Sequence, residues 1–387
     1  MIRVCHLITS MATGGAETAL YRLLTHADRQ RFAMTAVSLT DGGTYGPMLS
    51  AAGIPVHTLD MRRGRLSLGA FARLVALLRR EKPDILQTWL YHSDLIGTAA
   101  APFCGSPPLL WNIRCSVTDA RYVKGQAGAV VRLLARLSRR PRLIISNSEA
   151  GRIVHTALGY HPRAWEIVPN GVDTRMFAPD TEARRAVRNE LGLPRDAVLV
   201  GLVARFDPLK DHATFLQAAA RVIAKRAEVH FVAVGSGVSR GNPELDQLSA
   251  DLGLAGNLHL LGERRDIPRL NAAFDIATCS SLGEGFPNVL IEAMACATPC
   301  ISTDAGDSEL VLGDTGLIVP PADPEAFADA ILRLVDAGWD ERVRLGQAAR
   351  TRAQELYSLD TMVARYQALY AGIAEANTTR AGTASPP

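Results

Sequence analysis

Two carboxylates frame a loop containing glycine and proline in the stretch Ser280–Asn288, which leads into a helix-forming pattern that carries Glu292. Glu284 and Glu292 are eight residues apart. Each carboxylate can accept hydroxyl protons from a polyol, and the backbone N–H groups that the stretch Gly285–Asn288 offers, all but that of Pro287, can bind an anion at the start of a helix. Sugars and riboses require acceptors of this kind. Ordinary surface glutamates would explain either residue alone, but they explain the whole string poorly.

Two cations, Arg205 and Lys210, follow an apolar run at Val198–Ala204 that predicts a buried strand. An arginine and a lysine at the end of a strand could bind a diphosphate and stabilise its charge as it departs. A solvated loop that ends in a basic helix cap is the alternative. An isolated R-x4-K pair does not decide between the two.

A pair of glycines, Gly14 and Gly15, lies between the first apolar run and the first helical pattern. Glycines at this position let backbone N–H groups approach a phosphate closely, with help from the helix N-terminus. The string Thr13–Glu17 is neither a GxGxxG motif nor a Walker loop, so it does not indicate dinucleotide binding. A plain tight turn is the alternative.

Short apolar, β-branched runs alternate with longer amphipathic segments along the chain. In the first half the predicted strands are Arg3–Ile8, Ala33–Ser38, Val56–Leu59, Ile85–Thr88, Leu109–Ile113, Leu143–Ser146 and Glu166–Val168. In the second half they are Val198–Ala204, Val229–Val234, Leu258–Leu261, Ile276–Cys279, Cys300–Thr303 and Gly316–Val319. Such apolar strands are typical of buried parallel sheets with helical crossovers. The pattern predicts two doubly wound α/β domains, whose ligands bind beyond the carboxyl ends of the strands.

Helical patterns separate these strands, and a turn-rich stretch after Pro169 predicts a linker. The main predicted helices are Ala16–Thr25, Leu68–Arg80, Gly128–Ser138, Asp211–Ala224, Pro243–Leu252, Ile267–Asn271, Asn288–Ala295, Pro324–Asp336 and Asp340–Glu355. We expect a first domain over residues 1–170 and a second over 171–357. Residues 358–375 predict a C-terminal helix that packs back on the first domain, and the small, polar residues 376–387 predict a disordered tail.

The composition of the 387-residue chain, 48% hydrophobic and 21% charged, is that of a globular protein long enough for two domains. Its six cysteines show no CxxC spacing, which favours reduced and mostly buried thiols, and no cluster of Cys and His indicates a metal site. The first residues predict a buried strand and not a signal peptide. No run approaches the roughly 18 apolar residues of a membrane span.

Charge is distributed unevenly along the chain. Residues 1–170 contain 21 Lys and Arg against 10 Asp and Glu, whereas the remainder contains 21 against 29. A basic half indicates a negatively charged partner, and nucleic acid and an anionic membrane surface are both candidates on this ground alone.

The string EGFPNVLIEAMA, from Glu284 to Ala295, resembles the E-x7-E signature of family 4 retaining glycosyltransferases with the GT-B fold. The resemblance extends over nearly the whole chain. It includes Gly14–Glu17, Asn170–Asp173, the pair Arg205 and Lys210, Val234–Gly237, Leu261-Gly262 and Gly316–Pro320. One departure is Ala204, where many relatives carry glycine, and we expect little consequence from it. The resemblance implies two Rossmann-like doubly wound domains that face each other across a cleft, the first for the acceptor and the second for a nucleotide sugar.

The resemblance also implies roles in donor binding. Arg205 and Lys210 would bind the diphosphate, with Gly15 closing on it from the other domain. Glu284 would hold hydroxyls of the transferred sugar, and Glu292 would hold the ribose hydroxyls. The loop from Glu284 would bind the donor through Gly285, Phe286, Pro287 and Asn288, and its N–H groups, which Pro287 lacks, would donate to sugar and phosphate.

On the acceptor side, His92 falls where the family has a histidine that reaches the transferred sugar, which adds it to Arg205, Lys210 and Glu284 as an expected catalytic residue. A histidine that caps a helix or borders the core is the alternative. Asn112 and Arg114 follow another strand in the string Trp111–Ser116, and they could face the cleft and meet an anionic acceptor.

Arginines form two clusters in the first domain. One comprises Arg62, Arg63 and Arg65 with Arg79 and Arg80, and the other comprises Arg132, Arg136, Arg139, Arg140 and Arg142. Around the second cluster apolar residues recur at helical spacing, as in helices that lie on anionic lipid. A merely solvated helix is the alternative. The charge asymmetry and the lipid-linked acceptors of similar enzymes favour peripheral contact with an anionic membrane, whereas no interleaved aromatics support nucleic acid.

The resemblance implies a cytoplasmic hexosyltransferase, peripheral at the membrane, that retains anomeric configuration and needs neither a metal nor a cofactor, because the nucleotide sugar is a substrate. A UDP-sugar is favoured as donor, and GDP-mannose stays open. A lipid-linked saccharide of surface polysaccharide synthesis is the expected acceptor. A nucleotide-sugar epimerase of the same fold and a non-catalytic nucleotide-sugar-binding protein are alternatives, whereas the missing GxGxxG disfavours a nicotinamide oxidoreductase.

Overall fold

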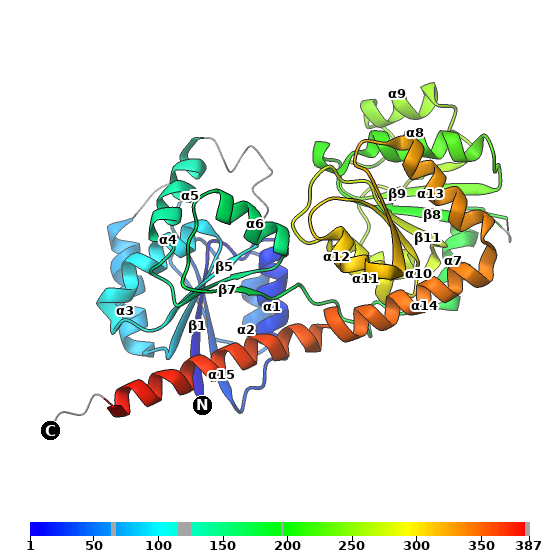
Figure 1. The fold of residues 1–387 in the computed structure, drawn as a ribbon. Helices are drawn as coiled ribbons and strands as arrows, with labels where there is room; N and C mark the ends of the chain where they lie inside the picture. Colours follow the sequence, from blue (N-terminus) through cyan, green and yellow to red (C-terminus); the bar gives the residue numbers. More distant parts are fainter. Residues whose placement is uncertain (63–66, 115–124, 195–196, 384–387) are drawn as a thin grey trace. The chain divides into compact units, whose positions relative to one another are not determined.

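A computed structural model of the chain describes residues 1–62, 67–114, 125–194 and 197–383. The chain forms two compact units, which are described separately below (Figure 1). Unit 1 comprises Met1–Gly171 together with the segment from Leu359 to the C-terminus, and unit 2 comprises Val172–Ser358. Each unit contains one parallel sheet, of seven strands in unit 1 and six in unit 2. The predicted fold class of two doubly wound α/β sheets is therefore confirmed.

The sheet of unit 1 has the strand order β3-β2-β1-β4-β5-β6-β7. Its strands are β1 Ile2–Ile8, β2 Phe32–Ser38, β3 Val56–Thr58, β4 Ile85–Trp89, β5 Leu109–Ile113, β6 Leu143–Ser146 and β7 Trp165–Ile167. The helices are α1 Gly15–His26, α2 Tyr45–Ala51, α3 Leu68–Glu81, α4 Tyr91–Ala100, α5 Gly125–Leu137, α6 Glu149–Ala157 and α15 Leu359–Thr383, with a 3-10 turn η1 at Ala101–Cys104.

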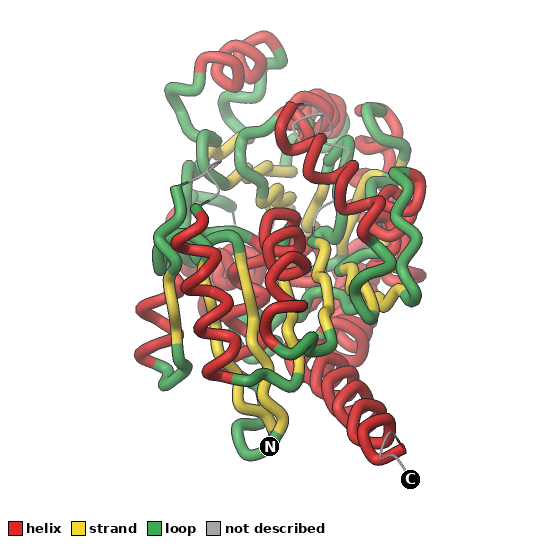
Figure 2. The backbone as a smooth tube through the Cα atoms, turned by 90° about the vertical axis from the view of Figure 1, so that its left-hand side faces the viewer, coloured by secondary structure: helices red, strands yellow, loops and turns green. Residues whose placement is uncertain are grey.

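Helices cover both faces of this sheet, because successive strand residues point to opposite sides. On β1, Val4 and Ile8 pack in one cluster with buried residues of α1 and α15. Cys5 and Leu7 pack in another cluster with buried residues of α3, α4 and α5. Figure 2 shows the strands of the molecule lying among helices in a second view.

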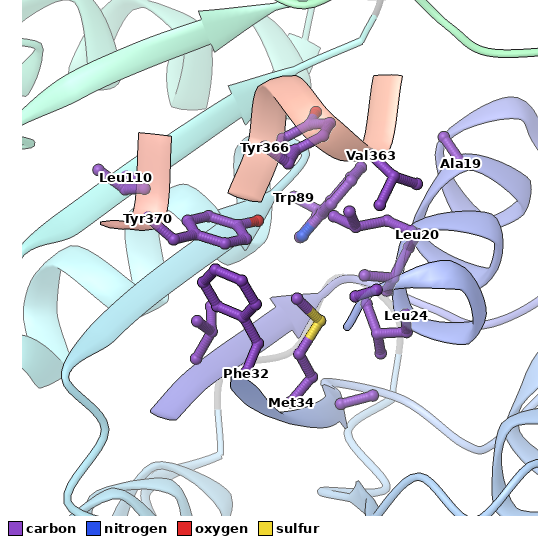
Figure 3. Packing of buried hydrophobic residues seen from close by; sticks show 14 of the residues in the cluster. Ala19, Leu20, Leu24, Phe32, Met34, Trp89, Leu110, Val363, Tyr366 and Tyr370 are labelled. Atoms are coloured by element: carbon purple, nitrogen blue, oxygen red, sulfur yellow. The ribbon is translucent and has the colours of Figure 1, made fainter. Parts of the chain in front are cut away.

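The C-terminal helix α15 belongs to the core of unit 1. Its Tyr366 stacks on Trp89 with ring centroids 6.1 Å apart, and its Tyr370 meets Phe32 edge-on at 6.1 Å (Figure 3). Both tyrosines are fully buried, and the Tyr370 hydroxyl donates to Gln87 Oε1 at 2.6 Å. The helix continues to Thr383, so residues 376–383 are helical where the sequence suggested a disordered tail, and no proline interrupts the chain between Leu359 and Pro386.

Unit 2 has the strand order β10-β9-β8-β11-β12-β13. Its strands are β8 Val198–Val203, β9 Val229–Val234, β10 Leu258–Leu260, β11 Ile276–Cys279, β12 Cys300–Thr303 and β13 Gly316–Val319. The helices are α7 Thr181–Glu190, α8 His212–Ile223, α9 Pro243–Asp251, α10 Ile267–Ala273, α11 Asn288–Ala295, α12 Ser308–Leu312, α13 Pro324–Asp336 and α14 Gly338–Tyr357, with 3-10 turns η3 Pro208–Lys210 and η4 Gly313–Thr315.

The change of unit between Gly171 and Val172 lies in the turn-rich stretch that the sequence suggested as a linker, and helix α7, which follows it, was not predicted. The helix is polar and buries little beyond Ala183 and Val187, so it has no apolar stripe to reveal it. Val187 belongs to the hydrophobic core of unit 2, and ion pairs add to this packing: Arg184 and Arg188 bind the buried carboxylate of Asp275 at 2.6 and 3.1 Å.

Two buried histidines make unit 1 sensitive to acid. Desolvation lowers the pKa of His6 to about 3 and that of His155 to about 4, against about 6.5 in an unfolded chain. Below pH 6.5 the unfolded chain therefore binds more protons than the folded one, and stability falls as the pH falls.

We expect each histidine to cost about 2 kcal/mol of unfolding free energy between about pH 7.5 and about pH 5. Urea unfolding at a series of pH values measures this loss. The variant His155→Gln should show a shallower dependence than the wild type, and an equal slope in both proteins would contradict the assignment.

Candidate functional site

The polar residues that the sequence singled out in unit 2 lie along the carboxyl edge of its sheet. Strand β8 pairs directly with β11, although β9 and β10 separate them along the chain. Open α/β sheets bind ligands in the crevice outside the strand ends where the order reverses in this way. Arg205 and Lys210 follow β8, and Glu284 follows β11, so the two groups of candidates share this position.

Lys210 and Glu284, 74 residues apart in the chain, form an ion pair between Nζ and Oε1. The side chain of Lys210 is 19% exposed and that of Glu284 is 12% exposed, so the pair is shielded from water yet reachable by a ligand. The hydroxyl of Ser281 also donates to Glu284 Oε1, at 2.7 Å. One carboxylate oxygen thus receives both a cation and a hydroxyl.

The loops that carry this pair are tied to each other. The Ser280 hydroxyl donates to the backbone oxygen of Lys210 at 2.8 Å, and the Leu282 N–H donates to the Leu209 oxygen at 2.8 Å. These bonds fix the loop after β11 against the turn after β8. The ammonium and the carboxylate are therefore held in place before any ligand arrives.

Arg205 lies on the same edge and is 59% exposed. Its Nη2 and Nε contact Asp207 Oδ2 at 2.9 and 3.2 Å. The other oxygen of Asp207 accepts from the Leu209 N–H at 3.0 Å and so caps the turn that ends in Lys210. A guanidinium has five N–H donors, and this contact leaves Nη1 of Arg205 available for an anion.

The loop that starts at Glu284 depends on a glycine that the sequence reasoning missed, Gly306. Its φ is +61°, and a Cβ there would lie 2.5 Å from the Glu284 carbonyl oxygen. Its neighbour Asp307 donates its N–H to the Gly285 oxygen at 3.1 Å. The sequence feature that could have identified Gly306 is a glycine in the turn after the strand β12.

The substitution Gly306→Ala should therefore displace the Glu284 carbonyl and lower both the activity that depends on this loop and the unfolding midpoint. The added methyl has no room, and the left-handed backbone costs an alanine about 1 kcal/mol more. The matched control is Gly256→Ala, because a Cβ at Gly256 would meet nothing within 4 Å. Differential scanning fluorimetry and an activity assay compare the two. Equal behaviour of both variants would contradict the close approach.

Helix α11 carries the rest of the predicted E-x7-E string. Pro287 precedes its first residue, Asn288, and the half-buried Glu292 lies one turn further along the same helix face. Phe286 is buried and packs against Tyr357 with ring centroids 5.7 Å apart. Phe286 therefore anchors the loop in the core, while backbone groups beside it can serve a ligand.

In unit 1, the candidates Gly15 and His92 also follow neighbouring strands, β1 and β4. Gly15 opens α1 and is exposed, and a Cβ there would meet nothing within 4 Å. The backbone oxygen of Gly14 accepts from both the N–H and the hydroxyl of Thr18, at 2.9 and 2.8 Å. The start of α1 is thus ordered and leaves space beside Gly15.

His92 lies in the first turn of α4 after a strained residue. Leu90 has φ +72° and ψ 156°, a backbone conformation that residues other than glycine rarely adopt. The Leu90 N–H donates to the Asn112 oxygen at 3.2 Å, and the hydroxyls of Ser93 and Thr9 lie 3.1 Å apart. These contacts fix the exposed His92 at the strand edge, where partial desolvation lowers its pKa.

Asn112 and Arg114 do not face open space as the acceptor prediction required. The Asn112 amide is fully buried and donates to the Tyr366 hydroxyl at 2.7 Å. Arg114 donates to the same hydroxyl at 3.0 Å and to Asn170 Oδ1, and its guanidinium lies 5.2 Å from the Trp89 ring centroid. Both residues join β5 to α15, and the prediction that they meet an acceptor is corrected on this ground. Cys115 and Ser116 lie outside the described residues.

The cysteines and acidic residues that the structure describes do not form a metal-binding cluster. Five cysteines are unpaired, and Cys5, Cys279, Cys296 and Cys300 are buried. No three His, Cys, Asp or Glu side chains among the described residues gather as a metal site. Likewise, no described helix is both long and apolar enough to cross a bilayer.

Comparison with known proteins gives two family matches that together span most of the chain. Residues 13–176 match the model "Glycosyltransferase Family 4", and residues 197–337 match "Glycosyl transferases group 1".

Named relatives include "UDP-Gal:alpha-D-GlcNAc-diphosphoundecaprenol alpha-1,3-galactosyltransferase" of Escherichia coli, 29% identical over 68% of this chain and 69% of that protein. The glycosyltransferase EpsF of Bacillus subtilis is 26% identical over 88% of this chain and 89% of its own length. A D-inositol 3-phosphate glycosyltransferase of Geodermatophilus obscurus is 34% identical over 59% of this chain, which spans about half, 52%, of that relative.

Solved structures match nearly the whole chain in fold. Anabaena HepE in complex with UDP has a TM-score of 0.83 at 22% identity, with 96% of this chain and 100% of HepE covered. Sucrose-phosphate synthase from Thermosynechococcus elongatus has a TM-score of 0.78 at 19% identity, with 97% and 100% covered.

Proposed function

This chain belongs to the group 1 glycosyltransferases of family 4, and from that premise we propose that it moves a sugar from a UDP-sugar to a hydroxyl of a lipid-linked saccharide. It is a glycosyltransferase with the GT-B fold, and nucleotide sugars are the donors of its family. The proposal adds that anomeric configuration is retained and that charge on the leaving diphosphate is neutralised by the protein itself.

The ion pair of Lys210 with Glu284 at the reversal of the strand order carries this proposal. When a donor binds, this ion pair can open, so that the cation and the carboxylate contact different parts of the donor. Lys210 and Arg205 then contact the diphosphate, and Glu284 accepts hydroxyl protons of the sugar. In this proposal Glu292 holds the ribose, Gly15 contacts the phosphate and His92 contacts the sugar.

In the proposed step the bond between the anomeric carbon and the diphosphate oxygen breaks, and its electron pair stays on that oxygen. The acceptor hydroxyl bonds the same carbon from the same face and gives its proton to a phosphate oxygen. No protein general base is needed. The protein lowers the barrier where negative charge develops, because Lys210, Arg205 and the N–H groups of Gly285, Phe286 and Asn288 are fixed in advance.

The donor and acceptor classes are supported by relatives. The E. coli relative is named for a UDP-galactose donor and an undecaprenol-diphosphate acceptor, and HepE was solved with UDP. A lipid-linked acceptor fits a role in surface polysaccharide synthesis and peripheral contact of the basic unit 1 with an anionic membrane. A cytoplasmic location stays a prediction.

A thermal-shift screen of nucleotide sugars, followed by product analysis with a lipid-linked acceptor, tests the function. We expect UDP-sugars to raise the unfolding temperature and the product to keep the donor's anomeric configuration. Conversion of the donor without any acceptor would instead identify an epimerase. Binding without turnover of any donor and acceptor pair would identify a binding protein and overturn the proposal.

Chelation gives a further prediction for the same assay. We expect sugar transfer to persist in EDTA at close to its rate in untreated protein, because the cations for the diphosphate are side chains. Loss of activity in EDTA, with recovery only on addition of a divalent ion, would contradict this. The control is a metal-dependent transferase assayed in the same buffer.

A further inference from the structure

A pocket of about 250 Å³ lies on unit 2, lined by residues of the helices α7 and α14. Its buried residues include Asp275 and Pro299, which directly precede the strands β11 and β12. The pocket therefore lies at the amino edge of the sheet, at the opposite end of β11 from Glu284, and we call it the amino-edge pocket. In Figure 1, α7 lies beside α10 and close to α14.

The buried part of the amino-edge pocket contains more cations than carboxylates. Arg184 and Arg188 bind different oxygens of Asp275, at 2.6 and 3.1 Å. Arg342 is the third cation: it lines the pocket, is 8% exposed, and forms no ion pair with any residue that the structure describes. The other carboxylate of the pocket, Asp180, is exposed and caps the start of α7 through two N–H groups. The buried arginines thus leave an excess of two positive charges over Asp275.

Arg342 also has unused hydrogen-bond donors. Its Nη1 donates to the backbone oxygens of Leu334 and Val335 at 3.0 and 3.2 Å. Its Nε is buried without a partner, and its accessible Nη2 makes no hydrogen bond to any described residue. Burial lowers the pKa of Arg342, Asp275 opposes this effect, and the nearby Arg184 adds to it. Because buried guanidinium groups are normally hydrogen-bonded, these donors favour an acceptor from outside the chain.

The mouth of the amino-edge pocket is apolar. Trp339 is 53% exposed, and Val343, one turn further along α14, is 38% exposed. The guanidinium of Arg184 lies 4.9 Å from the centroid of the Trp339 ring, so the indole and the cation are neighbours at the pocket. A ligand that combines an anionic group with an apolar part would contact both kinds of surface.

We propose that the amino-edge pocket binds the phosphate group of a small organic phosphate, whose apolar part contacts Trp339 and Val343. A phosphate monoester carries about 1.5 to 2 negative charges at neutral pH, which matches the excess of positive charge beside Asp275. Nη2 and Nε of Arg342 are adjacent donors, and a guanidinium can donate to two oxygens of one phosphate in this way.

The size of the pocket favours a small ligand over a segment of a protein partner, because small-molecule sites begin at about 300 Å³. The proposal does not depend on the donor or the acceptor of sugar transfer, since the carboxyl ends of β8 and β11 carry the donor residues.

Calorimetric titration of the full-length protein with phenyl phosphate and with inorganic phosphate tests the proposal. The variant Val343→Glu places a carboxylate at the mouth of the pocket, where it competes with phosphate for the arginines. Val343→Gln is the matched control. Because glutamate and glutamine both suit an exposed helix position, both variants should keep the unfolding midpoint of the wild type. A second variant, Arg342→Met, removes the guanidinium and keeps an unbranched side chain.

We expect wild type and Val343→Gln to bind phenyl phosphate alike, and Val343→Glu and Arg342→Met to bind it about 10-fold more weakly. Inorganic phosphate should bind the wild type more weakly than phenyl phosphate, since it has no apolar part for Trp339. Absence of binding by the wild type, or equal binding by Val343→Glu and Val343→Gln, would overturn the proposal.

Three further outcomes would also overturn the proposal. Loss of phenyl phosphate binding in saturating UDP would place the phosphate in the donor site. Equal affinity for the two phosphates would assign the amino-edge pocket to free phosphate. Self-association of the wild type that Trp339→Ala abolishes would assign this surface to a second copy of the chain.

Discussion

Replacing Lys210 by alanine should lower kcat for sugar transfer by about 10²- to 10³-fold, with little change in the fold. The ammonium lies at the reversal of the strand order and is held there by Glu284 and by the bonds of its loop. Because negative charge builds on the diphosphate only as the sugar leaves, the loss should appear in kcat more than in KM.

Steady-state kinetics with a UDP-sugar measures this effect. The matched control is Lys225→Ala, since Lys225 is an exposed lysine of the same unit, and it should keep wild-type rates. Circular dichroism and the unfolding midpoint establish that both variants are folded. Wild-type turnover by a folded Lys210→Ala protein would remove the role assigned to this residue.

The variant Glu284→Gln should separate donor binding from transfer. Glutamine keeps the shape of the side chain but removes the charge that pairs with Lys210 in the unliganded protein. UDP alone should therefore bind the variant at least as tightly as the wild type, because the ammonium is released for the diphosphate. Transfer should nevertheless fall by about 100-fold, since the sugar loses its carboxylate acceptor in the transition state.

Calorimetric titration with UDP and a transfer assay together test this pair of expectations. Glu228→Gln, at an exposed glutamate of unit 2, is the control and should change neither quantity. A parallel loss of UDP affinity and transfer would mean that Glu284 supports the diphosphate site as a whole. That outcome would contradict its assignment to the sugar.

Most of the sheet architecture could be predicted from the sequence, because buried parallel strands are short, apolar and β-branched. The predicted ranges Leu109–Ile113 and Ile276–Cys279, for example, are the observed β5 and β11. Helix α7 was not predicted, since its buried apolar residues are only Ala183 and Val187 and ion pairs with Asp275 contribute to its packing. The extension of α15 to Thr383 was hidden by its small, polar composition.

Within the candidate site, the sequence indicated residue types but not partners. Lys210 and Glu284 could be proposed from their positions after two strands, and only the strand order brings them into contact. The burial of Asn112 against Tyr366, 254 residues away, depends on α15 packing on the sheet, which no local pattern reveals. The close approach of Gly306 to Glu284 is likewise a product of the tertiary fold.

A crystal structure of the protein with a non-hydrolysable UDP-sugar tests the donor site most directly. We expect the diphosphate within hydrogen-bond distance of Lys210 and Arg205, the sugar hydroxyls on Glu284, and the ribose on Glu292. A complex in which the diphosphate lies away from the carboxyl ends of β8 and β11, with Lys210 still paired to Glu284, would contradict the proposed chemistry.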